Sequence, residues 1–161
     1  MQPEPSYFLQ DRGGFVANSQ IQTLAMTPVG VLAIQNPISP TGQEIRKAFA
    51  DEIKVSSNRF VTVEVGLCPN SDISGGSVLP VQSLGSPGSQ TGMIALVGNA
   101  SSPIVISGAI PFETYYGNPD GDDKNKITKQ WIILPGYTLF VRLTQSIIGT
   151  GSVSLKWRES L

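Results

Sequence analysis

Short runs of alternating apolar and polar residues, separated by turn residues, make up most of this chain. Residues 60–67 place Val61, Val63, Val65 and Leu67 on one face and polar side chains on the other. Comparable or more continuous apolar runs are found at residues 14–18, 21–26, 29–34, 78–81, 93–97, 103–107, 131–134, 138–144 and 152–157. Runs spaced about 10–15 residues apart, with Gly, Pro, Asn or Ser between them, predict an antiparallel β-sandwich or barrel.

One segment, residues 43–55, fits two patterns. Ile45, Ala48, Phe49 and Ile53 recur at helical spacing. Ile45, Phe49, Ile53 and Val55 also recur at even spacing, as the residues on one face of a strand do. Periodicity by itself favours a helix here.

Residues 1–12 are predicted to form an N-terminal arm, and residues 13–161 a single domain. Two prolines near the start block regular structure, and Tyr7, Phe8 and Leu9 make a small apolar group. The segment is interpreted either as a frayed terminus or as an arm that docks on a partner through these three residues.

The amino-acid composition excludes several kinds of catalytic and binding site. The 161 residues include 11 Lys and Arg, 12 Asp and Glu, and no His, which excludes His-based acid–base catalysis and His-ligated metals. The single cysteine, Cys68, excludes an internal disulfide, and a net charge of −1 gives no electrostatic footprint for nucleic acid. Charged residues are only 14%, which suggests that other chains cover part of the surface. Neither a secretory signal nor a membrane-length apolar run is expected.

The sequence contains three candidate sites, and none of them matches a complete functional motif. Residues 118–126 are rich in Asp, Asn and Gly, whose oxygen atoms could bind Ca²⁺. An EF-hand calcium loop needs Glu at its twelfth position, but that position, counted from Asp120, is Trp131. A solvated turn is therefore favoured. Tyr115 and Tyr116 could bind a sugar, although adjacent residues of an extended segment point to opposite sides. Without a His to activate it, Cys68 is interpreted as structural.

Three stretches, taken together, resemble a known class of protein. Residues 31–37 form an apolar run ending in Asn36-Pro37, residues 133–142 contain Leu-Pro-Gly before an alternating run, and residues 151–159 end in Trp-x-Glu. In this order they resemble small structural proteins of tailed bacteriophages, which are jelly-roll sandwiches that decorate or cement the capsid. The resemblance favours a strand for residues 43–55, although Arg46-Lys47 departs from a purely apolar strand.

The resemblance implies an all-β, antiparallel jelly-roll sandwich with no catalytic residues, located on the outside of the virion after synthesis in the host cytoplasm. No cofactor or metal is expected. Its partner would be the major capsid protein, and the chain would also form a dimer or trimer with itself. Neither nucleic acid nor a membrane is expected as a partner. The residues expected to contact partners are Tyr7, Phe8, Leu9, Phe140 and Arg142. The alternative is a head- or tail-fibre module that binds host surface glycans through Tyr115, Tyr116 and residues 120–123.

Overall fold

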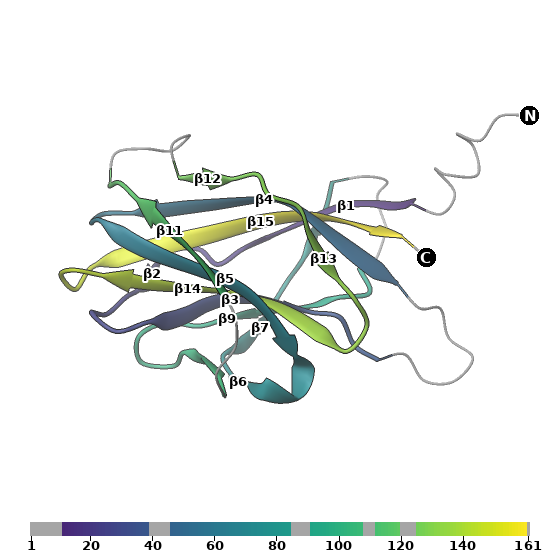
Figure 1. The fold of residues 1–161 in the computed structure, drawn as a ribbon, viewed down its shortest axis with the longest axis horizontal. Helices are drawn as coiled ribbons and strands as arrows, with labels where there is room; N and C mark the ends of the chain where they lie inside the picture. Colours follow the sequence, from purple (N-terminus) through teal and green to yellow (C-terminus); the bar gives the residue numbers. More distant parts are fainter. Residues whose placement is uncertain (1–10, 39–45, 85–90, 108–111, 120–124, 161) are drawn as a thin grey trace, which may run out of the picture.

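The computed structural model describes residues 11–38, 46–84, 91–107, 112–119 and 125–160. Within these ranges every regular element is a β-strand except one 3-10 turn, η1 (Asn70–Asp72). The strands form two antiparallel sheets that stack as the two layers of a sandwich, as Figure 1 shows. The prediction of an all-β sandwich is therefore confirmed. The described residues contain no helix that could span a membrane.

The first sheet has seven strands. They are β1 (Asp11–Asn18), β2 (Gln22–Thr23), β4 (Lys47–Ser57), β8 (Gln82–Ser83), β12 (Lys126–Ile127), β13 (Trp131–Ile133) and β15 (Thr150–Ser160). Their order is β12–β4–β15–β1–β8, with β13 also beside β4 and β2 beside β15. The longest pairing joins β4 to β15, which lie next to each other in Figure 1.

The second sheet has eight strands. They are β3 (Val29–Gln35), β5 (Val61–Pro69), β6 (Ile73–Gly75), β7 (Ser77–Leu79), β9 (Ile94–Val97), β10 (Ile104–Ile106), β11 (Phe112–Gly117) and β14 (Tyr137–Gln145). Their order is β11–β5–β14–β3–β10–β6, and β9 joins β3 to β7.

The pairings of the main strands are nested. Strand β1 pairs with β15, β3 with β14, β4 with β13, and β5 with β11, and all four pairings are antiparallel. The first and last long strands are therefore neighbours, as are the second and the second-to-last. The first and third of these pairs, β1·β15 and β4·β13, lie in one sheet, and the second and fourth, β3·β14 and β5·β11, lie in the other.

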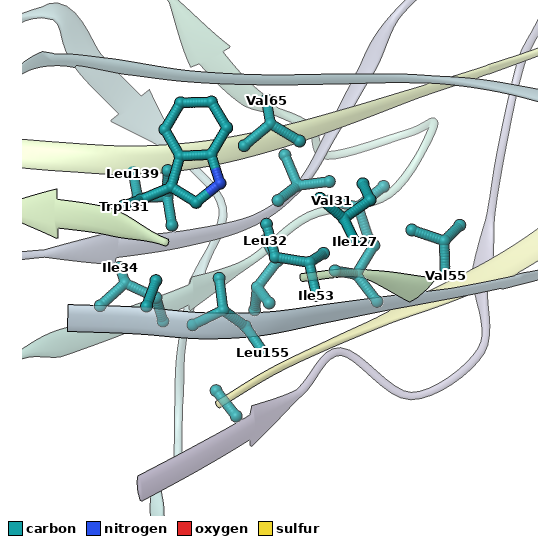
Figure 2. Close-up of a cluster of buried hydrophobic side chains, with 14 of the residues drawn as sticks. Val31, Leu32, Ile34, Ile53, Val55, Val65, Ile127, Trp131, Leu139 and Leu155 are labelled. Carbon is teal, nitrogen blue, oxygen red and sulfur yellow. The ribbon is translucent and has the colours of Figure 1, made fainter. Parts of the chain in front are cut away.

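The core fills the space between the two sheets and is made by alternating residues of the long strands. The inward positions of β5, β14 and β15 are those that the sequence pattern predicted. They are Val61, Val63 and Val65, then Leu139, Val141 and Leu143, then Val153, Leu155 and Trp157, all buried. Figure 2 shows residues of both sheets meeting there, among them Val65, Leu139, Ile53 and Leu155. Each such side chain contributes about 1.5–3 kcal/mol by leaving water.

The ambiguous segment is a strand over its described part, since Lys47–Ser57 forms β4 and residues 43–45 lie outside the described residues. Opposite β15 the register shifts by one residue, which leaves Asp51 as an extra residue in β4. Because a bulge of this kind moves the preceding residues to the other face, Phe49 points outward while Ile53 enters the core. The expectation that Phe49 and Ile53 share a face is therefore wrong.

The boundary of the predicted arm also needs correction. Strand β1 begins at Asp11, where its backbone pairs with Ser160, so residues 11–12 belong to the sheet and not to an arm. Residues 1–10, which include Tyr7, Phe8 and Leu9, lie outside the described residues.

Candidate interaction surfaces

Part of the outer face of the second sheet is covered by the chain itself. Phe140 is 0% exposed and packs with Ala33, Cys68 and Ile104 in a second apolar cluster outside the main core. Ile73, Leu96 and Ile106 pack against this cluster from the segment between β5 and β11. The prediction that Phe140 contacts a partner is therefore wrong, because residues far away in the sequence already bury its ring.

A close approach of two backbones makes this cover possible. A Cβ atom at Gly30 would lie 2.1 Å from the carbonyl oxygen of Ile104, so only glycine allows β10 to reach β3. Glycine is needed at position 98 for the same reason, since a Cβ atom added there would lie 2.4 Å from the carbonyl oxygen of Gly30.

Arg142 lies at the border of this cover and is itself engaged. Its Nε is 3.2 Å from Oε1 of Glu64, an ion pair without an aligned hydrogen bond. The guanidinium also lies over two rings, 4.9 Å from the centroid of Phe112 and 5.2 Å from that of Phe140. Since the Arg142 side chain is only 21% exposed and already paired with Glu64, its charge is much less accessible to a partner than we expected from the sequence.

The two tyrosines of β11 point to opposite sides, as the strand pattern predicted. Tyr115 packs against the core, and its hydroxyl donates a hydrogen bond to Glu113. Burial, together with the Glu113 carboxylate, raises the pKa of Tyr115 to about 12. Tyr116 is 81% exposed on the other face. The pair therefore does not form one sugar-binding platform, and Tyr116 alone remains available.

The acidic stretch 120–123 lies outside the described residues. Its described flanks are tied together by Asn125, whose side-chain amide accepts a 3.0 Å hydrogen bond from the backbone of Asn118 and donates one of 2.7 Å to its carbonyl. In the part of the chain that the structure describes, no group of three or more Cys, Asp or Glu side chains is placed to hold a metal ion.

Five of the described carboxylates form ion pairs at the surface or in the core. Asp51 contacts Arg158, Glu52 contacts Lys54 and Lys126, Glu64 contacts Arg142, Glu113 contacts Lys129, and Glu159 contacts Arg46.

Cys68 is 1% exposed. Burial raises the pKa of its thiol to about 11, Asp72 adds to this rise, and Arg142 opposes it. A protonated, buried thiol is a poor nucleophile, so the interpretation of Cys68 as structural is confirmed.

The end of the sandwich opposite the start of β1 carries a group of exposed large apolar side chains, which we call the apolar tip. Its members, each more than half exposed, are Ile21, Met26, Phe60, Ile147 and Ile148. Hydrogen bonds join the three loops that carry them. The backbone N–H of Leu24 donates to Gly149 at 2.9 Å, and that of Asn58 donates to Thr150 at 3.1 Å.

A buried amide holds the loops of the apolar tip in place. Gln145 is 1% exposed, and its Nε2 donates to the Ser57 hydroxyl at 2.7 Å and to the Thr150 carbonyl at 3.1 Å. Its backbone N–H donates to the Ala25 carbonyl at 3.0 Å. Sequence reasoning missed this surface, although apolar residues inside turns such as 146–149 were a visible signal.

The outer face of the first sheet is mixed, since Val16, Phe49 and Ile132 lie on it, but most of its residues around the centre of β15 are polar. We call the part around the centre of β15 the lysine–serine face. Its members are Asn18, Glu52, Lys54, Ser56, Lys126, Ser152, Ser154 and Lys156. All eight are partly or fully exposed, since the inward positions of these strands are the ones that fill the core.

Comparison of the chain with protein-family models, with curated proteins and with solved structures gives no significant match.

Proposed function

We propose that this chain is a virion structural protein that binds the outside of a bacteriophage capsid and cements neighbouring subunits of the major capsid protein. The observation that carries the proposal is the apolar tip. Large apolar side chains gathered on adjoining loops are typical of protein contact sites, because water leaves them readily when a partner covers them. The resemblance of residues 31–37, 133–142 and 151–159 to phage capsid decoration proteins supplies the kind of partner.

The fold proposed for this role is a jelly roll. In that arrangement eight strands pair first with last, second with seventh, third with sixth and fourth with fifth. The nested pairings β1·β15, β3·β14, β4·β13 and β5·β11 support it. The strands between β5 and β11 form an insertion, of which β6, β7, β9 and β10 extend the sheet beside β3 while β8 pairs with β1.

The proposed mechanism is mechanical and involves no turnover of a substrate. A domain that bridges several capsid subunits adds contact area that must be lost before those subunits can separate. The apolar tip contacts the capsid, the arm with Tyr7, Phe8 and Leu9 gives a second contact, and a closed dimer or trimer of the chain fits symmetric lattice positions. The ion pairs that occupy five of the described carboxylates are in keeping with a structural role.

The test is a pull-down of purified expanded capsids with the recombinant chain. We expect the wild-type chain to co-sediment with capsids, and the double variant Ile147→Ser/Ile148→Ser to bind at least about tenfold more weakly, because its tip buries less apolar surface. The matched control is Val78→Ser/Val105→Ser, which removes two exposed apolar side chains that are not part of the tip. Deletion of residues 1–10 tests the arm separately and leaves β1 complete.

Each part of the proposal has a result that would contradict it. Failure of the wild-type chain to bind capsids would overturn the capsid role. Equal binding by the tip and control variants would remove the apolar tip from the mechanism, and unchanged binding after deletion of residues 1–10 would remove the arm.

A further inference from the structure

The register of four neighbouring strands places polar side chains in one row on the lysine–serine face. Asn18 of β1 lies opposite Ser154 of β15, Ser154 lies opposite Lys54 of β4, and Lys54 lies opposite Lys126 of β12. Directly paired residues of antiparallel strands have Cβ atoms about 4.5–5.5 Å apart, so this row is a continuous strip of hydrogen-bonding groups.

The strip borders a shallow hollow between β4 and β15. The hollow is lined by Lys54, Val55, Ser56, Ser152 and Ser154. In the next row Ser56 lies opposite Ser152. Because three of its five lining residues are serines with short side chains and only Lys54 has a long one, the hollow leaves room for a narrow chain that lies flat on the sheet.

The charge of this face differs from that of the whole molecule. Three lysines share one carboxylate, because Lys54 and Lys126 contact Glu52 at 3.8 and 3.3 Å while Lys156 lies opposite Glu52 in the register. The face therefore carries two more positive than negative charges, although the chain as a whole carries −1. A ligand that complements it is negatively charged.

We propose that the lysine–serine face binds an anionic polysaccharide chain whose uronate carboxylates pair with Lys54, Lys126 and Lys156. The Ser152 and Ser154 hydroxyls then exchange hydrogen bonds with sugar hydroxyls, since a hydroxyl both donates and accepts. None of the exposed large apolar residues belongs to this face, which disfavours a protein partner, whose interface has an apolar centre. The face also lacks an aromatic ring on which nucleic-acid bases would stack.

The experiment measures binding of the full chain to sodium polygalacturonate by isothermal titration calorimetry, with neutral dextran and single-stranded DNA as comparison ligands. We expect binding to polygalacturonate that weakens between about 0.05 and 0.5 M NaCl, because salt screens ion pairs. The double variant Lys54→Gln/Lys156→Gln should bind at least about tenfold more weakly, as expected for two lost charge-assisted contacts. The matched control, Arg59→Gln/Lys129→Gln, removes the same charge from elsewhere and should bind as the wild type does.

A second variant separates the shape of the hollow from its charge. Ser154→Tyr fills the hollow and leaves the net charge unchanged, so it should also weaken polygalacturonate binding at least about tenfold if the chain lies there. Thermal unfolding of each variant checks that the surface substitutions keep the fold.

Four results would overturn the proposal: no polygalacturonate binding by the wild type, equal losses in the two double variants, full binding by Ser154→Tyr, or tighter binding of DNA. The proposed function can fail independently. Capsid binding depends on the apolar tip at one end of the sandwich, so Lys54→Gln/Lys156→Gln should still bind capsids as the wild type does.

Discussion

The indole nitrogen of Trp157 donates a 2.9 Å hydrogen bond to the carboxylate of Glu159, two residues further along β15. Both side chains point inward because residues two apart on a strand share a face. Glu159 is 0% exposed and also accepts hydrogen bonds from the backbone of Gly92 at 2.7 Å and from the Thr91 hydroxyl. Its ion pair with Arg46, at 3.3 Å, completes the set. A single carboxylate thus joins three distant segments of the chain.

The first prediction concerns this carboxylate. Glu159→Ala should lower the free energy of unfolding by about 3 kcal/mol, because it removes the ion pair with Arg46 and the acceptor of three hydrogen-bond donors. The estimate is at the low end for buried pairs, since the Arg46 side chain is 23% exposed. Urea denaturation followed by tryptophan fluorescence measures the effect.

Glu113→Ala is the control for Glu159→Ala, because it removes a carboxylate that is 42% exposed and paired with a surface lysine. Ion pairs between exposed side chains contribute little to stability, because water already solvates both charges. If the two variants lost similar stability, Glu159 would not have the central structural role described above.

A second prediction addresses the cover over Phe140. Gly30→Ala should displace β10, because the new methyl group would lie 2.1 Å from the Ile104 carbonyl oxygen. Gly14→Ala is the control, since its Cβ meets Leu84 at 3.6 Å, an ordinary contact. Hydrogen exchange should be faster in β10 and β6 of Gly30→Ala than in the control. Equal protection of these strands in both variants would show that the close approach is not needed.

The thiol of Cys68 gives a third prediction. Since it is buried and its pKa is raised to about 11, native protein at neutral pH should not react with Ellman's reagent over the time in which unfolded protein reacts fully. In Gly30→Ala the reaction should become measurable, because Cys68 belongs to the cluster that β10 covers. Rapid labelling of the native wild type would contradict the burial described here.

A fourth prediction concerns acid. Burial opposes ionisation of Asp51, but hydrogen bonds from Arg158 and Gln130 outweigh this and hold its pKa below the ordinary 3.8. A carboxylate with a lowered folded-state pKa stabilises the fold above its unfolded pKa, and this contribution is lost as pH falls through the folded value.

The wild type should therefore have a higher Tm than Asp51→Asn at neutral pH, and the difference should disappear as the pH falls well below 3.8. Thermal unfolding followed by circular dichroism at a series of pH values measures both. Because Asp51 and Arg158 are partly exposed, the difference should also shrink in high salt. A difference that is constant across this pH range would mean that the ion pair does not contribute.

Local patterns in the sequence determined the fold class and much of the core. The alternation in β5, β14 and β15 identifies the inward residues, because a strand with one buried face must alternate. The Leu-Pro-Gly motif noted in the sequence forms the turn before β14, where Gly136 adopts a φ of 89°, which glycine tolerates.

Tertiary pairing decided what the local pattern left open. The segment 47–57 has apolar residues that fit a helix or a strand, and pairing with β15 on one side and β13 on the other makes it a strand, with the bulge at Asp51 turning Phe49 outward. The cover over Phe140, the apolar tip and the lysine–serine face depend on residues far apart in the sequence. Such surfaces arise only when strands are brought into register, because sequence spacing carries no information about which strands become neighbours.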